Sequence, residues 1–165
     1  MKNVRKVLVA LALSEHSQGA YEFAADFAQC TGAELIVANI INERDVASVR
    51  TISAMGYAVD GEHYIANVKA ERARMLEEII SASDRPRDRT RTVVTVGNPM
   101  DEILKLIVEE SVDVVVMGPK GSTDLEHVLV GSVAEKIFRR SPATVISYRD
   151  GKLAERYKHR IEKHL

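Results

Sequence analysis

The feature that most restricts how this chain folds is the alternation of short apolar runs with segments of helical periodicity. Continuous apolar runs are typical of strands that are covered on both faces. When such strands alternate with amphipathic helices, they favour an α/β fold with a parallel sheet. The sequence therefore predicts a five-stranded parallel sheet with helices on both faces. The expected strands are Val7–Leu11, Leu35–Ile41, Thr92–Val96, Asp113–Met117 and Ala143–Tyr148.

Helices are expected in four of the connections, with capping residues at several of their ends. Gly32 is placed to end the first helix, and Asn98-Pro99 reads as an N-cap followed by a first-turn proline. The stretch from Asn42 to about Gly61 is less regular, and no helix is predicted there. The expected helices run from Ser14 or Ser17 to Gly32, from about Glu62 to Ala82, from Met100 to Glu110 and from Val133 to Arg140.

The length of 165 residues fits one compact domain, which we place at residues 1–149. Residues 150–165 form a tail beyond the last strand. Within it, apolar residues recur every four positions from Leu153 to Leu165, which predicts a helix. We expect this helical tail to pack on its own domain or on a partner subunit.

Composition and charge exclude several classes of function. A net charge of −1 gives no general reason to bind nucleic acid, and no apolar run approaches the roughly 20 residues of a membrane span. The single cysteine, Cys30, fits a reducing compartment, so a cytoplasmic protein is expected. The five histidines lack metal-ligand spacing, and no catalytic constellation is present, so we predict no metal site and no catalytic residue.

A glycine motif follows the fourth expected strand. The chain reads Gly118-Pro-Lys-Gly121, then nine residues, then Gly131-Ser132 at the start of a helix. Glycine allows the backbone to approach a ligand closely, and the unpaired N–H groups of a helix start attract phosphate. The spacing favours a nucleotide site, although turn geometry without a ligand would also explain the glycines.

Three segments are expected to meet at the carboxyl edge of the sheet, where α/β proteins bind ligands. They are residues 12–17 after the first strand, residues 40–42 after the second, and residues 118–132 after the fourth. The N–H groups of Gly131, Ser132 and Val133 would hold a phosphate, and the Ser132 hydroxyl could add a bond. Lys120 is the nearest cation in this loop.

Several of these segments together resemble the universal stress protein family. The matching runs are Val9-Ala-Leu-Ala-Leu-Ser-Glu-His-Ser17, Val96-Gly-Asn-Pro99, Asp113-Val-Val-Val-Met-Gly-Pro-Lys-Gly121 and the stretch from Val128 to Ile146. The resemblance implies an open-twisted, Rossmann-like sheet of the adenine-nucleotide alpha-hydrolase type. It also implies a homodimer through the last strand, here Thr144–Tyr148.

One branch of that family binds ATP through a G-x2-G-x9-G-[ST] motif, which is the spacing found here. Carried over, the resemblance implies that the nucleotide phosphates and ribose are contacted by the motif residues and that Ile40 lies against the adenine. The residues so implied for the phosphates and ribose are Gly118, Gly121, Gly131, Ser132 and Val133, with Met117 nearby.

The end of the first strand departs from the family pattern. The ATP-binding branch usually has an acidic residue there, in a V-D-x-S pattern that contacts the nucleoside. This chain has Leu11-Ala12-Leu13-Ser14, so Ala12 stands at the acidic position before Ser14. The lost polar contact would cost about 0.5–1.5 kcal/mol of nucleotide-binding free energy, and an intact phosphate loop could still bind the nucleotide. Alternatively, Leu13 narrows the pocket or alters base selectivity.

The leading hypothesis is therefore a universal-stress-type binding module that holds ATP, with Mg²⁺ on the phosphates, and acts in stress response. It would signal through nucleotide-dependent conformation or partner contact. Two alternatives stay open at this point. One is a dimeric scaffold with a vestigial pocket, which the alanine at position 12 favours. The other is a slow ATP hydrolase, for which the sequence offers no clear general base.

Overall fold

The computed structural model describes residues 3–55, 61–119 and 131–163, and strands and helices alternate along them. The strands are β1 (Lys6–Ala10), β2 (Glu34–Asn42), β3 (Thr90–Gly97), β4 (Val114–Met117) and β5 (Thr144–Ser147). The helices are α1 (Ser17–Thr31), α2 (Glu43–Ala54), α3 (Gly61–Ser81), α4 (Pro99–Glu109), α5 (Ser132–Arg140) and α6 (Gly151–Glu162).

The five strands form one parallel sheet in the order β3-β2-β1-β4-β5, which confirms the predicted fold class. Strand β1 lies at the centre, and its Val7 is in register with Leu35 of β2 and with Val114 of β4. The chain moves outward in one direction from β1 to β3 and in the other direction from β4 to β5. The strand order therefore reverses between β1 and β4, and this is the point where such sheets form a ligand crevice.

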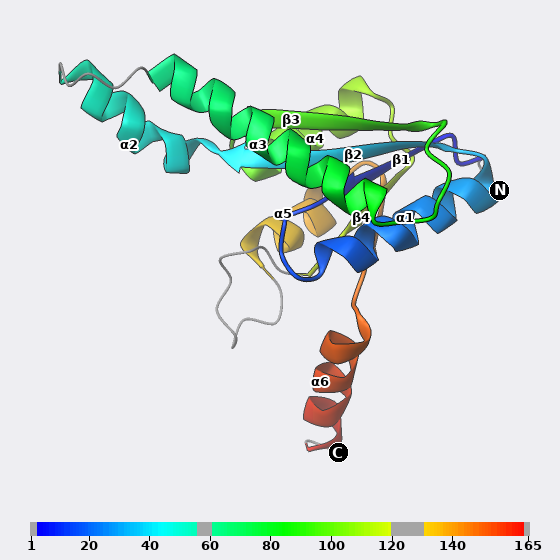
Figure 1. Cartoon of the computed structure of the whole chain (residues 1–165). Helices are drawn as coiled ribbons and strands as arrows, with labels where there is room; N and C mark the ends of the chain where they lie inside the picture. Colours follow the sequence, from blue (N-terminus) through cyan, green and yellow to red (C-terminus); the bar gives the residue numbers. More distant parts are fainter. Residues whose placement is uncertain (1–2, 56–60, 120–130, 164–165) are drawn as a thin grey trace.

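The central strands are apolar on both faces because helices cover both faces (Figure 1). Val7 and Val9 of β1 point to the face that packs on α1 and α3, where Leu76 is buried. Leu8, between them, points to the opposite face, which packs on α4 and α5. Side chains alternate between the two faces along each strand, so the same strand supplies both halves of the core.

Helix α2 is the main difference from the sequence prediction, which placed an irregular stretch there. It begins directly after β2, where the Asn42 side chain accepts a hydrogen bond from the Arg44 N–H at 3.1 Å. Its first turn holds Glu43 and Asp45, which suit the positive end of a helix, and Val46 is buried. The sequence of this helix shows no clear apolar periodicity, so the helix was not recognised from the sequence.

Two predicted helix ends are confirmed. Gly32 ends α1 in the left-handed conformation, and the Asn98 side chain caps α4 by accepting a hydrogen bond from the Met100 N–H at 3.1 Å. The start of α1 differs from the prediction in its cap. The N-cap residue is His16, which makes no side-chain capping bond, and Ser17 is the first helical residue.

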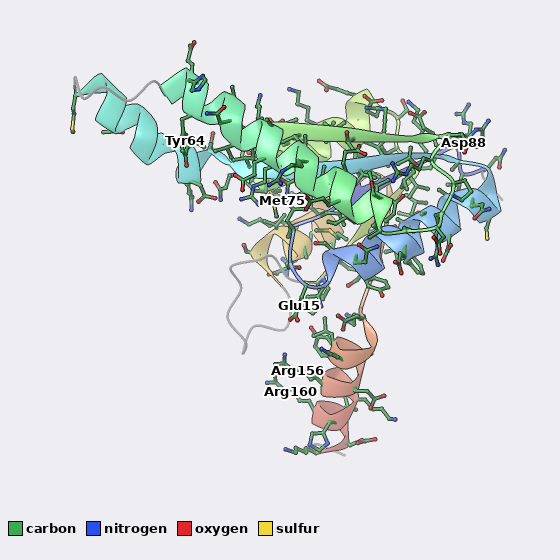
Figure 2. All side chains as sticks on the ribbon, viewed as in Figure 1. Glu15, Tyr64, Met75, Asp88, Arg156 and Arg160 are labelled. Atoms are coloured by element: carbon green, nitrogen blue, oxygen red, sulfur yellow. The ribbon has the colours of Figure 1, made fainter. Side chains whose placement is uncertain are left out.

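Helix α6 projects away from the body of the domain (Figure 1). Asp150 caps it by accepting a hydrogen bond from the Leu153 N–H at 2.8 Å, and Leu153 is buried against the domain. Arg156 and Arg160 lie further along this helix, one turn apart (Figure 2). None of the helices within the described ranges is long and apolar enough to cross a membrane.

Candidate functional site

A cavity of about 320 Å³ opens at the carboxyl ends of β1, β2 and β4. Its walls also come from α1, α2, α3, α4 and α5, so elements from most of the chain meet there. The cavity lies where the strand order reverses, because β1 and β4 are neighbours that lead to opposite sides of the sheet. Described residues from all three segments expected at this edge line one cavity.

Most of the residues singled out from the sequence line this cavity. They are Ala12, Ser14, Ile40, Met117, Gly118, Gly131, Ser132 and Val133. Lys120 and Gly121 lie outside the described residues. Leu13, which was considered as a residue that narrows the pocket, is not among the cavity residues and packs instead against the α1 side of the core.

The start of α5 gives the cavity an anion-binding character. Gly131 is the N-cap residue, with φ −68° and ψ 151°, and its N–H donates a hydrogen bond to the Pro119 carbonyl oxygen at 2.6 Å. The first intrahelical bond runs from the Glu135 N–H to the Gly131 carbonyl at 3.0 Å. The N–H groups of Ser132 and Val133 precede this bond, so they have no acceptor within the helix. They are available to an anionic group in the cavity.

An apolar wall adjoins this helix start. Met117 and Ile103 are buried in the core between the sheet and α4, and Ile40 packs against the same cluster. All three residues also line the cavity. The cavity therefore combines an apolar surface with a helix N-terminus, an arrangement that suits a flat ring carrying a phosphate group.

The loop between β1 and α1 is held by short-range hydrogen bonds. The Ser14 N–H donates to the Ser17 Oγ at 3.0 Å, and the Ser17 N–H donates to the Ser14 carbonyl at 3.0 Å. Leu13, just before this turn, has φ 53°, which is strained for a residue with a side chain. The turn thus fixes the loop backbone at the wall of the cavity, next to Ala12.

The sequence reasoning missed several polar residues of the cavity. Asn39 on β2, Asp45 on α2 and Arg72 on α3 all line it. His16 also lines it and belongs to the segment 12–17 that was expected at this edge. Asn39 carried a signal, since it is a polar residue inside a run of buried apolar ones. Arg72 gave no such signal, because the helical periodicity of α3 does not reveal which of its polar side chains lines the cavity.

His16 connects the cavity to the C-terminal helix. Its Nδ1 atom makes a hydrogen bond with the carboxylate of Asp150, the residue that also caps α6. Burial by itself raises the pKa of Asp150, but the hydrogen bonds from the Leu153 N–H and from His16 outweigh it, so the pKa lies below the ordinary 3.8. One carboxylate thus holds both the loop that lines the cavity and the start of α6.

Removing the Asp150 side chain is expected to loosen α6. Because its folded-state pKa is lowered, Asp150 stabilises the fold above the ordinary aspartate pKa, and this stabilisation is lost as the pH falls through the folded value. Asp150→Ala should cost about 1 kcal/mol through the lost cap. Asp150→Asn keeps a capping oxygen and is the matched control. Hydrogen exchange of the α6 amides measures the effect, and equal exchange in the two variants would contradict it.

Comparisons with known proteins support a single family. The profile of the universal stress protein family matches residues 3–149. A universal stress protein of Methanocaldococcus jannaschii is 28% identical over 151 residues, covering 86% of this chain and 93% of the relative. A universal stress protein of Bacillus subtilis is 30% identical over 148 residues, covering 87% of this chain and 98% of the relative.

Solved structures of universal stress proteins share the fold. One, in complex with cAMP, has a TM-score of 0.60 at 22% identity and covers 90% of this chain and 98% of its own. Another, from Archaeoglobus fulgidus in complex with dAMP, has a TM-score of 0.58 at 17% identity and covers 89% of this chain and 99% of its own. At these identities the comparison establishes the common fold.

Proposed function

Because the chain belongs to the universal stress protein family, we propose that it is a binding module for an adenine nucleotide, with ATP as the leading candidate. The main observation behind this proposal is that one cavity contains both a helix N-terminus and an apolar surface. The start of α5 offers N–H groups that have no acceptor within the helix, and the apolar wall around Ile40 offers a surface for a base. This combination suits a ligand with a phosphate at one end and an aromatic ring at the other.

The ligands of the structural relatives support the choice of an adenine nucleotide. One relative is in complex with cAMP and another with dAMP. Both ligands contain adenine, a sugar and a phosphate, and ATP carries the same three parts with two further phosphates. The proposed site therefore needs to recognise only the adenine, the sugar and the first phosphate. The two further phosphates of ATP would extend from the start of α5.

We assign each part of the nucleotide to the residues that line the cavity. The phosphates would accept hydrogen bonds from the N–H groups of Ser132 and Val133 at the start of α5, with Gly131 leaving room for their approach. The ribose would lie near Met117 and Gly118, and the adenine against Ile40. Lys120 and Gly121, outside the described residues, are proposed to complete the phosphate loop.

Magnesium would enter with the nucleotide. Within residues 3–55, 61–119 and 131–163, no group of three or more His, Cys, Asp or Glu side chains is arranged to hold a metal ion. The phosphate oxygens of ATP would supply Mg²⁺ ligands, and Mg²⁺ commonly keeps several of its waters in such sites. The protein would then contribute to metal binding chiefly by fixing the phosphates.

The proposed role follows from the position of the site. The cavity is built from elements on both faces of the sheet, and bound nucleotide would favour the conformation in which these elements are close. Such a change in conformation, or in contacts with a partner, would be the signal that the protein gives in stress response. No reaction chemistry is needed for this role.

A homodimer through β5 is part of the proposal. Strand β5 is at one edge of the sheet, and its Thr144 and Ser147 side chains are exposed. An open parallel edge is a ready surface for pairing with a second copy. Sedimentation equilibrium should give twice the chain mass of 18.3 kDa. A monomer mass over a wide concentration range would contradict the dimer.

Titration calorimetry tests the nucleotide proposal. The protein, first stripped of bound ligand by partial unfolding and refolding, is titrated with ATP, ADP, AMP and cAMP, each with and without Mg²⁺. We expect saturable binding of ATP at one site per chain, strengthened by Mg²⁺. Refolded protein with native melting behaviour that binds none of the four ligands would overturn the proposal.

A further inference from the structure

Helix α6 carries an apolar stripe that its own domain covers at one end. Leu153 is 5% exposed and buried against the domain, whereas Ile161, further along the helix, is 60% exposed. Tyr157 lies between them and is half-buried, with the Arg149 guanidinium over its ring at 5.1 Å from the ring centre. A helix of 12 residues is only marginally stable without tertiary packing, so the outer half of α6 needs a surface that covers Ile161.

The charges of α6 indicate what kind of surface this is. Residues 151–163 contain five Lys or Arg and two Glu. Arg156 and Arg160 extend from the same side of the helix (Figure 2), and each follows a residue of the apolar stripe by three positions, so both flank the stripe. Glu155 and Glu162 lie on the opposite side, given the 3.6-residue turn of a helix. The covering surface is therefore expected to be apolar with acidic groups beside it.

The outer face of α1 has this character. Phe23 is 38% exposed and stacks on Phe27 with the ring centres 6.4 Å apart, so the two rings form one row along the helix. Glu22 and Asp26 form the neighbouring row, and α1 contains no Lys or Arg. Asp26 is paired with Arg85 at 2.8 Å, whereas Glu22 accepts a hydrogen bond from a neutral glutamine at 2.9 Å. Helices α1 and α6 are thus complementary in charge.

A second copy of the chain that pairs through β5 brings its α1 to the face from which α6 extends. An edge strand pairs with its own copy in antiparallel orientation about a two-fold axis perpendicular to the sheet, so the α1 helices of both copies lie on the same face. Helix α6 starts on this face, because its N-cap Asp150 is bonded to His16, the N-cap of α1.

The antiparallel pairing also fixes which end of α1 is near. Helix α1 runs back from the carboxyl edge of the sheet to the edge where the strands begin, since it joins two parallel strands, β1 and β2. In the pair, the β5 strand of the second copy ends beside the start of the first copy's β5. Each α6 therefore extends from the joined sheet at the end where α1 of the other copy finishes.

The β5 edge alone is too small for a stable dimer. It has four residues, and its Val145 and Ile146 are already half-buried within the single chain. Stable protein interfaces bury about 1,200–2,000 Å² in total. Two α6 helices, each of which covers apolar surface on the other copy, would supply the area that the strands lack.

We infer that α6 is an arm that docks on the outer face of α1 of a second copy, an inference that rests on the homodimer in the proposed function. Tyr157 and Ile161 pack against the row that contains Phe23, and Arg160 lies on the side of the acidic row that contains Glu22. The family profile matches residues 3–149, so the arm follows the shared domain and adds to the β5 pairing.

Sedimentation equilibrium of Ile161→Asp tests the apolar contact. Ile161 is exposed in the single chain, so the substitution should leave the fold of the monomer unchanged. The dissociation constant of the dimer should rise at least about tenfold, because a carboxylate replaces an apolar contact. His159→Asp is the matched control, since it places the same carboxylate on the opposite side of α6, and it should dimerise like the wild type. Hydrogen exchange of the α6 amides shows whether both variants keep the helix.

A charge exchange tests the docking surface. Arg160→Glu and Glu22→Lys should each weaken the dimer several-fold, and the double variant should recover most of the wild-type affinity. A double variant no tighter than either single variant would overturn the docking on α1. A wild-type dimer whose dissociation constant is unchanged in Ile161→Asp would overturn the inference and leave the β5 dimer in place. A wild-type monomer at all concentrations would overturn both.

Discussion

Gly131→Val is expected to reduce nucleotide affinity at least about 100-fold, which corresponds to about 2.7 kcal/mol. Gly131 lies at the start of α5, and its backbone conformation, φ −68° and ψ 151°, is open to any residue. The substitution should therefore leave the backbone in place. Its effect would come from an isopropyl side chain that occupies the space proposed for the phosphates. Calorimetry with Mg-ATP measures the loss, and the melting temperature reports whether the fold is kept.

Ser132→Ala is the matched control at the next position. Its side chain is exposed, and its removal leaves the backbone N–H of the same residue in place. Loss of one hydroxyl hydrogen bond should cost about 0.5–1.5 kcal/mol, or up to roughly tenfold in affinity. If folded Gly131→Val bound Mg-ATP as tightly as the wild type, the phosphates would not lie at the start of α5.

Ile137→Ala is expected to lower the free energy of unfolding by about 2–5 kcal/mol. Ile137 is 0% exposed and joins α5 to the core beneath the sheet, in the cluster that also contains Leu8 and Met117. Its truncation leaves a cavity in close-packed surroundings, and α5 loses its only fully buried side chain within the described residues. For a chain of this size, each 1 kcal/mol lowers the melting temperature by roughly 2–4 °C.

Phe138→Ala supplies the comparison on the same helix. Phe138 is 71% exposed, so its removal should change the unfolding free energy by no more than about 0.5 kcal/mol. Chemical denaturation of both variants gives the two values under the same conditions. If both variants lost the same free energy of unfolding, α5 would not be held to the core through Ile137.

The central strands β1, β2 and β4 could be predicted because they are buried on two faces. Val7, Leu8 and Val9 contact helices on alternate sides, so the sequence there is continuously apolar. Helix α2 was not predicted because its sequence shows no clear apolar periodicity. Val46 is buried, and Glu43, Arg44 and Asp45 before it are exposed.

The two sides of the candidate site differ in how far the sequence predicts them. Gly118, Gly131 and Ser132 lie close together in the chain and follow a spacing with a physical meaning, so their side of the cavity was expected. Asn39 and Arg72 belong to separate elements, β2 and α3, and both line the same cavity. Such a convergence depends on tertiary packing and leaves no pattern in a single sequence.

The most direct test of the central claim is to identify what the purified protein carries. The protein is denatured in acid, and the released small molecules are separated and weighed by mass spectrometry. The account predicts an adenine nucleotide in near-stoichiometric amount in the wild type and its loss from Gly131→Val. Wild-type protein that releases no nucleotide and also fails to bind added Mg-ATP would contradict the account.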